Sequence, residues 1–298
     1  MNIWYEKYTP KVIEDVILPE NVKNHLIDCI KKEKLPNLGF WSHQPGLGKS
    51  CTSKAIINSL NADALFINAS LERGIDVVRN KIMQFASAMS LDDRIKIVVL
   101  DECDYIGTEA QASMRGFLDE FSANCSFIFT GNFKSKIIEP LLDRLENYDF
   151  AEFPKEQMVK PIFEKLKSIV IAEGFEFNPE KQQLLLSIIK NCYPKIRNMI
   201  GSLQRALTTN STDIDSSQST YEEILKTLKI KDYPKLIEQT NSLTNPDGMF
   251  EFLYSRITEF SKLPNAVQSL AKGQFQSSQV RDKNLNLAST LCELTNFV

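Results

Sequence analysis

A glycine-rich segment at residues 43–50 carries the side chains best suited to chemistry. It reads His-Gln-Pro-Gly-Leu-Gly-Lys-Ser and lies between an apolar run and a helical pattern. Gly46 and Gly48 allow a tight loop whose backbone N–H groups can point at phosphate oxygens. Lys49 adds a positive charge and the Ser50 hydroxyl can bind Mg²⁺, while the start of the following helix favours anions through its dipole. The segment therefore indicates a phosphate-binding loop.

One residue departs from the usual phosphate-loop pattern. That pattern has a further glycine at the place occupied here by His43. A glycine-rich turn before a helix can also be purely structural. The loop alone therefore leaves both interpretations open.

Two adjacent carboxylates end a later apolar run. Asp101 and Glu102 follow the run 97–100. At a strand end, Asp101 can hold Mg²⁺ through water, and Glu102 can polarise a water for in-line attack on a γ-phosphate. Many strands end in an acidic turn, but the phosphate loop upstream favours phosphoryl chemistry. Asp104 completes an Asp-Glu-Cys-Asp tetrad, and we assign it no chemical role.

Two polar residues further along the chain carry weaker signals. Asn132 follows the apolar run 125–130. An amide beside a γ-phosphate can position the attacking water, and a simple turn asparagine is the alternative. Arg144 closes a helical pattern over 135–142 and is by itself typical of a solvated surface charge. Local sequence alone gives neither residue a role.

The elements that must position these residues alternate between strands and helices. Strands separated by helices predict a parallel sheet covered on both faces, which is an α/β domain. In the helical pattern over 75–89 the apolar residues recur at helical spacing, so we expect this stripe to be core. The predicted strands are 38–41, 64–68, 95–101, 125–130 and 148–153.

The strand signal stops after Pro154. The polar stretch 210–220 is typical of a linker, and the remainder, 221–298, is again helical with nothing that resembles an active site. Between Pro154 and the linker, helical patterns cover 156–173, 179–192 and 195–209.

Composition limits the classes of protein that fit. The chain has 298 residues, 43% hydrophobic and 24% charged, which is typical of a globular protein with two or three domains. No apolar run reaches the length of a membrane span and the polar N-terminus does not resemble a signal peptide, so we expect a cytoplasmic protein without a membrane partner. Six cysteines without a CxxC pair and only two histidines disfavour a zinc module, a disulfide framework and a His-based triad. With a net charge of −3, any nucleic-acid binding must come from a local basic patch.

The motifs taken together resemble the AAA+ sliding-clamp loaders. Their order and spacing are similar to the small subunits of replication factor C, and the compact length and the region 15–19 look closer to the clamp-loader large subunit of tailed bacteriophages. The resemblance covers residues 1 to about 210. It rests on 6–10, 45–50, 73–82, 101–104, Asn132, 136–140 and 194–197.

This resemblance implies an architecture and partners. It implies an AAA+ ATPase core at 1–153, a helical lid at 154–212 and an all-α collar at 213–298. Copies of the chain and a non-identical subunit would form an open spiral, with ATP and Mg²⁺ at the subunit interfaces, a sliding clamp below and primer-template DNA inside. If the chain is viral, the compartment would be the cytoplasm of a bacterial host.

The resemblance also implies roles for particular residues. Arg144 matches the arginine finger that is supplied to a neighbour's ATP, and Arg197 matches the second sensor, which reaches the chain's own nucleotide from the lid. Asn132 matches the residue that positions water. The segment from Gly46 and Leu47 to Cys51 would hold the phosphates, whereas Tyr5, Glu6, Lys7, Tyr8 and Ile17 would border the adenine.

Further residues are implied to contact DNA or to relay that contact. Arg79 lies where family members grip the DNA backbone. Gln111 and Arg115, four apart on one helix face, resemble the pair that relays DNA contact to Glu102. Weaker DNA candidates are Arg73, Lys81, Lys134 and Lys136.

Three departures from the family pattern affect this comparison. Asp143 and Leu145 flank Arg144 where family members have serine and cysteine, so an adjacent carboxylate could partly neutralise the finger. Thr9 replaces an arginine, which removes a basic contact. His43 requires a less strained turn but leaves the lysine and serine of the loop untouched.

The sequence therefore predicts a DNA-stimulated ATPase subunit that opens and loads a sliding clamp. Two alternatives remain. One is a non-hydrolysing scaffold subunit, although such subunits usually lose loop or carboxylate residues that are present here. The other is a different AAA+ DNA motor, such as a helicase or a helicase loader.

Overall fold

The structure is a computed structural model of the chain and describes residues 3–71, 75–88, 94–208, 216–243, 246–277 and 279–298. Two compact units make up the chain, Met1–Ser211 and Thr212–Val298. The first unit contains both the predicted ATPase core and the predicted lid. The domain boundary at residue 153 falls inside this unit and stays a prediction.

Five parallel strands form the sheet of the first unit, in the order β2-β3-β4-β1-β5. The parallel α/β sheet predicted from the sequence is confirmed. In register, Trp41 at the end of β1 lies beside Gly131 of β4 and Asp149 of β5. The strands are β1 Leu38–Trp41, β2 Asp63–Asn68, β3 Lys96–Asp101, β4 Cys125–Gly131 and β5 Glu146–Asp149.

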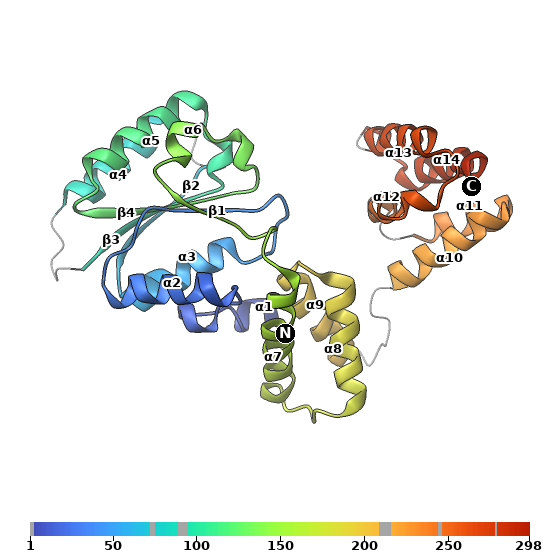
Figure 1. The fold of residues 1–298 in the computed structure, drawn as a ribbon, viewed down its shortest axis with the longest axis horizontal. Coiled ribbons are helices and arrows are strands. Elements are labelled where there is room, and N and C mark those ends of the chain that lie inside the picture. Colours follow the sequence, from blue (N-terminus) through green and yellow to red (C-terminus); the bar gives the residue numbers. More distant parts are fainter. Residues whose placement is uncertain (1–2, 72–74, 89–93, 209–215, 244–245, 278) are drawn as a thin grey trace. The chain divides into compact units, whose positions relative to one another are not determined.

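Helices cover both faces of this sheet (Figure 1). Alternate residues of each strand point to opposite faces, so that Val98 of β3 joins one core cluster and Val99 the other. The first cluster lies under α4 (Ile75–Ser87), α5 (Thr108–Glu120) and α6 (Glu139–Leu142). The second lies under α2 (Glu20–Lys31) and α3 (Lys49–Leu60), with the short η1 (Ile13–Asp15) beside them. The stripe predicted as core is confirmed at Val78 and Ile82, which are buried in the first cluster.

Three sequence predictions on element boundaries were wrong. The fifth strand runs over Glu146–Asp149 rather than 148–153, because Phe150 and Phe153 pack into the core beyond the strand end. The predicted helix over 135–142 is instead the 3₁₀ turn η3 (Lys134–Lys136) followed by α6, which begins with a proline in its first turn. The predicted linker extends too far, since α10 already begins at Ser216.

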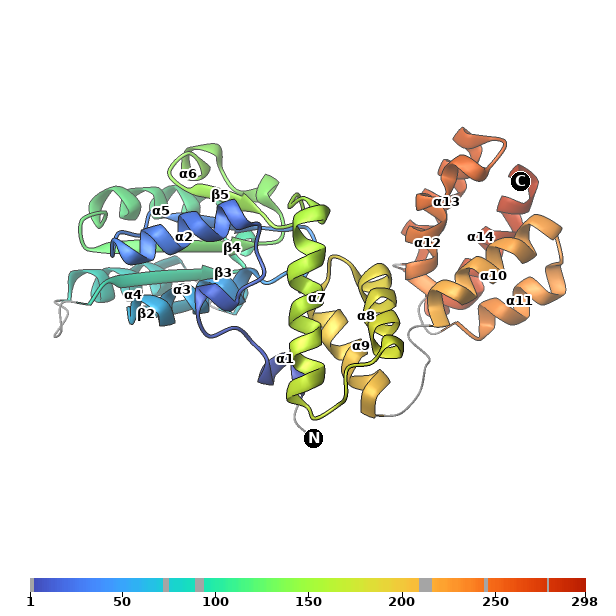
Figure 2. The same cartoon turned by 60° about the horizontal axis from the view of Figure 1, so that its bottom comes forward.

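The remaining helices of the first unit pack on one another beyond the sheet (Figure 2). They are α7 (Lys155–Ala172), α8 (Pro179–Cys192) and α9 (Ile196–Thr208). The N-terminal helix α1 (Trp4–Lys7) lies with them rather than with the sheet: the Trp4 backbone N–H donates to Gln204 of α9. The Tyr8 hydroxyl and the Lys7 ammonium both donate to Glu173, which follows α7. We refer to α7–α9 as the lid helices.

The second unit is helical and has its own core. Tyr221, Leu236, Phe250 and Leu291 are among its buried residues. None of the described helices in the chain is long and apolar enough to cross a membrane. The elements of this second unit are α10 (Ser216–Ile230), α11 (Tyr233–Asn241), α12 (Pro246–Ser255), η4 (Ile257–Glu259), α13 (Leu263–Ser277), α14 (Lys283–Leu294) and η5 (Thr295–Phe297).

Close packing at Gly39 gives a stability prediction. A Cβ there would lie 2.7 Å from Asn147 Oδ1 and 2.8 Å from Trp41 Nε1, two atoms that are themselves hydrogen-bonded. We expect Gly39→Ala to lower the free energy of unfolding of the first unit by about 1–3 kcal/mol, because one of these side chains must move. Denaturant unfolding followed by tryptophan fluorescence measures this, since both tryptophans lie in that unit.

Gly116→Ala is the matched control. Gly116 lies in α5, and a Cβ there would meet no atom within 4 Å. The control should stabilise the unit by roughly 0.5–1 kcal/mol, because alanine loses less backbone entropy than glycine in a helix. Equal behaviour of the two variants would contradict the packing argument.

Candidate active site

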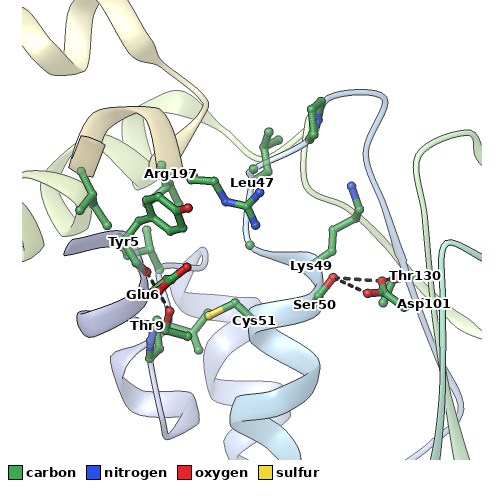
Figure 3. A pocket seen from close by; sticks show the side chains of 18 of the residues that line it. Tyr5, Glu6, Thr9, Leu47, Lys49, Ser50, Cys51, Asp101, Thr130 and Arg197 are labelled. Carbon is green, nitrogen blue, oxygen red and sulfur yellow. Dashed lines mark hydrogen bonds between the residues drawn. The ribbon is translucent and has the colours of Figure 1, made fainter. Parts of the chain in front are cut away.

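A cavity of about 460 Å³ lies at the carboxyl ends of β1, β3 and β4. In parallel α/β sheets, ligands generally bind beyond the carboxyl ends of the strands, at the point where the strand order reverses. The cavity matches this rule, because it lies at the end of β1, which has β4 on one side and β5 on the other. Figure 3 shows Lys49, Ser50 and Asp101 on one side of the cavity and Tyr5, Glu6 and Arg197 on the other. The site therefore combines the carboxyl ends of the strands, the N-terminal segment and the lid helices.

The phosphate loop has a backbone conformation that its glycines permit. Gly46 and Gly48 have φ values of 86° and 110°, in the left-handed region, and Gly48 is the N-cap of α3. The backbone of His43 does not lie in that region, so a histidine is tolerated at this position. Leu47 and Cys51 also line the cavity.

Lys49 is the most buried cation of the site, with an exposed fraction of 9%. Its ammonium donates to Asn132 Oδ1 at 3.0 Å and to the carbonyl oxygen of Ser42 at 3.3 Å. Burial lowers the pKa of Lys49, and the carboxylates of Asp101 and Asp104 act in the opposite direction. An anionic phosphate in the cavity would compensate the positive charge of Lys49, which burial disfavours.

Ser50 and Asp101 present the oxygens expected of a magnesium site. The Ser50 hydroxyl donates to Asp101 Oδ1 at 3.0 Å, and the Thr130 hydroxyl donates to the same oxygen. Within the described residues, no group of three or more acidic, histidine or cysteine side chains gathers as a metal cage. This donor set fits Mg²⁺, which keeps several waters and uses one or two protein ligands together with substrate phosphates. Thr130 was missed by the sequence reasoning, although its place at the end of β4 was an available signal.

Glu102 stands at a sharp turn directly after β3. Its φ and ψ are 57° and 39°, in the left-handed region, which is uncommon for a residue other than glycine. Such strain is concentrated at functional positions. Asp101 ends β3 and Glu102 lies in the turn, and both line the cavity. The two adjacent carboxylates can therefore have different roles, one at a metal ion and one at a water molecule.

Asp104, to which the sequence reasoning gave no role, supports the Asn132 turn. Its side chain is 5% exposed, and Oδ1 accepts the backbone N–H of Asn132 at 3.1 Å. Its Oδ2 is buried without a hydrogen-bond partner in the described part of the protein. A Cβ at Gly131 would lie 3.0 Å from Oδ1, so the carboxylate also sits tightly against the end of β4. Asp104, the last residue of the tetrad, thus holds the backbone of Asn132, whose side-chain amide contacts Lys49.

The other wall of the cavity comes from the N-terminal segment. Tyr5, Glu6, Tyr8 and Ile17 all line it, as the family resemblance implies for an adenine border. The structure places Lys7 outside the lining, paired with Glu173. Thr9, where the family has arginine, lines the cavity and donates its hydroxyl to the carbonyl oxygen of Tyr5, which closes the turn after α1.

The lid helices contribute two cations. Arg197 donates its backbone N–H to the carbonyl oxygen of Gly46 at 3.3 Å, so the start of α9 touches the phosphate loop. Its guanidinium lies 5.7 Å from the centre of the Tyr5 ring. Lys165 of α7 also lines the cavity. It was missed because a lysine in a long amphipathic helix has no local signal that separates it from a solvated face.

Arg144 lies outside the chain's own cavity. Its Nε and one terminal nitrogen donate to the two carboxylate oxygens of Asp119, at 2.9 and 3.1 Å. This contact raises the pKa of Arg144 and lowers that of Asp119, so the pair stays ionised around neutral pH. Asp143 was the carboxylate considered from the sequence, but the hydrogen-bonded one is Asp119. Leu145 is buried in the sheet core and does not face the site.

The residues predicted to relay DNA contact differ in their surroundings. Gln111 is 2% exposed; its amide donates to the carbonyls of Ile106 and Lys136 and accepts from the Ile138 N–H. It therefore ties α5 to the segment that follows Asn132. Arg115 is exposed on the same helix, where its charge contributes to lowering the pKa of Asp119.

The DNA candidates lie on two elements. Arg79 and Lys81 are exposed on α4, and Lys134 and Lys136 are exposed on η3. The Lys136 ammonium lies 5.6 Å from the ring centre of Tyr105 and 4.9 Å from that of Phe133. Arg73 lies outside the described residues.

Comparisons with known proteins agree with this geometry. Residues 42–152 match the family model "ATPase family associated with various cellular activities (AAA)". Two solved structures of Thermotoga maritima RuvB variants share the fold, with TM-scores of 0.56 and 0.57 at 15% identity, over 79% and 81% of this chain and 87% and 88% of theirs. Fold and site together define an AAA ATPase.

Closer relatives narrow the class. The chain is 32% identical to the sliding-clamp-loader large subunit of Enterobacteria phage T4, over 86% of this chain and 84% of that protein. It is 32% identical to the corresponding subunit of Escherichia phage RB69, over 79% and 76%. A replication factor C small subunit of Methanocella arvoryzae is 35% identical over 69% of this chain and 63% of its own length. The chain belongs to the sliding-clamp-loader family of AAA ATPases.

The buried hydrogen bond of Asp104 generates a prediction. Asp104→Ala leaves the Asn132 N–H without its acceptor, and we expect the free energy of unfolding to fall by about 1–3 kcal/mol. Asp104→Asn keeps an acceptor oxygen of the same shape and should lose less. Denaturant titration followed by tryptophan fluorescence reports both variants, since both tryptophans lie in the first unit and Trp41 packs against Gly131. An equal loss in the two would show that the charge of Asp104, and not its hydrogen bond, matters.

Proposed function

We propose that this chain is the ATPase subunit of a sliding-clamp loader and that it uses ATP to open a clamp and load it onto primer-template DNA, with hydrolysis releasing clamp and DNA. The observation that carries the proposal is one cavity in which a phosphate loop and an acidic strand end are both intact and adjacent. The sliding-clamp-loader relatives, similar over most of the chain, supply the biological context. A non-hydrolysing scaffold would not need this complete set.

The residues divide the work on ATP between them. The phosphate loop and Lys49 bind the phosphates, and Tyr5 and Ile17 face the adenine. Ser50, and Asp101 through water, would hold Mg²⁺, which would supply positive charge at the phosphate oxygens. Glu102 accepts the hydrogen bond of the attacking water and polarises it, and Asn132 fixes its direction.

Arg197 and Arg144 complete the charge balance from opposite sides. Arg197 reaches the chain's own nucleotide from the lid, next to the phosphate loop that its backbone already touches. Arg144 lies outside its own cavity, so we assign it to the ATP of a neighbouring copy. An arginine supplied in this way is worth on the order of 10³ to 10⁵ in rate, which would make hydrolysis slow in isolated chains.

DNA would influence this site through basic residues on α4 and η3. Arg79, Lys134 and Lys136, with Lys81 and Arg73 as further candidates, would hold the phosphate backbone, so affinity should fall steeply with salt and depend little on sequence. Gln111 would transmit the contact, because it bonds the backbone of Lys136, four residues after Asn132. Arg115 is assigned to the same relay. The partners are further copies of the chain, a non-identical subunit, the clamp and primer-template DNA.

The need for two partners at once tests the proposal. We expect ATP turnover to remain low with primer-template DNA alone or clamp alone, and to rise with both, because only then is every pocket of the loader competent. Turnover is measured as phosphate release from the assembled loader. Glu102→Gln, which should bind ATP and not hydrolyse it, gives the background rate. Stimulation by single-stranded DNA without clamp would instead favour another AAA+ motor.

Mixing two inactive variants tests the shared pocket. Arg144→Ala removes the donated arginine and Lys49→Ala removes nucleotide binding, and each alone should lower turnover by roughly 10³-fold or more. In a mixture, some interfaces join an intact Arg144 to an intact Lys49, so part of the turnover should return. A mixture no more active than its components would contradict the assignment of Arg144 to a neighbour.

A further inference from the structure

The contact between Arg144 and Asp119 has a geometry that leaves part of the guanidinium available. Asp119 lies in the last turn of α5, and Arg144 follows α6. The carboxylate accepts side-on, from Nε at 2.9 Å and from one terminal nitrogen at 3.1 Å. The other terminal nitrogen donates to the carbonyl oxygen of Pro140 at 2.9 Å. Two elements therefore grip the same side chain.

Two N–H groups of the Arg144 guanidinium remain available. A guanidinium has five N–H donors, one on Nε and two on each terminal nitrogen. Asp119 and Pro140 accept three of them, and no further hydrogen bond reaches this side chain from the described residues. One N–H therefore remains on each terminal nitrogen. One donor on each terminal nitrogen is the number that two oxygens of a phosphate group can accept.

Stability alone does not account for this contact. Asp119 is mostly solvent-exposed, at 59%, and Arg144 is 35% exposed, and ion pairs that water reaches contribute little to folding. What the contact does change is the freedom of a long side chain. Arginine loses substantial rotamer entropy when it is fixed, and a preformed orientation removes this cost from a later binding event.

We propose that Asp119 is a positioning residue that holds Arg144 with its two unused N–H groups ready for the terminal phosphate of a nucleotide on a neighbouring copy. This inference rests on the proposed function of Arg144. Asp119 touches no phosphate itself. It acts by orienting the guanidinium before the neighbour arrives, so that the transition state does not have to order it.

The opposite role would also produce an ion pair. A carboxylate that sequestered the arginine would have to be displaced before Arg144 could reach a phosphate, and its removal would speed hydrolysis. The side-on geometry favours positioning, because Asp119 takes only one N–H of one terminal nitrogen and none of the other. The two roles predict opposite signs for the same substitution.

The first measurement examines the contact in the free full-length chain. In chains labelled with ¹⁵N-arginine, the Nε–H signal of Arg144, identified by its loss in Arg144→Lys, should be resolved in the unaltered protein. Asp119→Asn should move it towards the position of a solvated arginine. Asp143→Ala is the matched control, since it removes a carboxylate next to Arg144 that makes no hydrogen bond to it, and it should leave the signal in place. An unchanged signal in Asp119→Asn would overturn the contact and the inference.

The second measurement uses ATP turnover by the assembled loader with clamp and primer-template DNA. Asp119→Ala should lower kcat by roughly tenfold while KM for ATP changes by less than about twofold. The reason is that a misplaced Arg144 weakens the contact with the transition state, whereas the neighbouring copy binds ATP mainly with its own residues. Asp119→Glu, which keeps the carboxylate, should recover most of the rate. In an Arg144→Ala background, Asp119→Ala should have no further effect.

Each contrary outcome has a distinct meaning. A faster Asp119→Ala loader would show sequestration, and an equal loss in the Arg144→Ala background would show that Asp119 acts elsewhere; either result overturns the inference. An unchanged kcat in Asp119→Ala does the same while leaving the role of Arg144 intact. If Arg144→Ala itself kept full turnover, the proposed function of Arg144 would fail and this inference with it.

Discussion

A buried lysine ammonium organises the site. Lys49 is held among the Ser42 carbonyl, the Asn132 amide and nearby carboxylates, in a place where its positive charge is disfavoured by burial. A buried charge must be paired, and the neighbouring groups do this only in part. A phosphate group in the cavity would complete the pairing, which would explain why the surrounding elements converge here. The glycines of the loop and Glu102 line the same cavity as this charge, and Asp104 holds the backbone of Asn132, whose side chain contacts it.

The parts of the site that the sequence predicted are those encoded by contiguous residues. The phosphate loop and the Asp101–Glu102 pair each occupy a short segment whose spacing directly determines the geometry, and the strand preceding each loop fixes where it lies. The parallel sheet followed from alternating strand and helix patterns for the same reason. Assigning roles to Asn132, Arg144 and Arg197 required the family resemblance, because a lone amide or arginine has many uses.

What the sequence could not predict depends on distant contacts. Asp119 and Arg144 are separated along the chain and meet only because α5 and α6 pack on the same face of the sheet. Lys165 enters the cavity because α7 stands beside it, and Asp104 became recognisable only when its carboxylate was seen against Asn132. The fifth strand was misplaced because aromatic residues just past its end carry the apolar signal. In each case packing, rather than local pattern, determines the outcome.

The N-terminal segment has a consequence for how the protein is made. Trp4 bonds to Gln204, and Tyr8 bonds to Glu173, so the earliest residues dock on helices that are synthesised much later. Contacts of such large sequence separation are slow to form. During translation, the phosphate loop and the acidic strand end can fold well before α9 has emerged from the ribosome. The wall of the cavity that the N-terminal segment provides therefore forms last, and the cavity is complete only once the lid helices have been made.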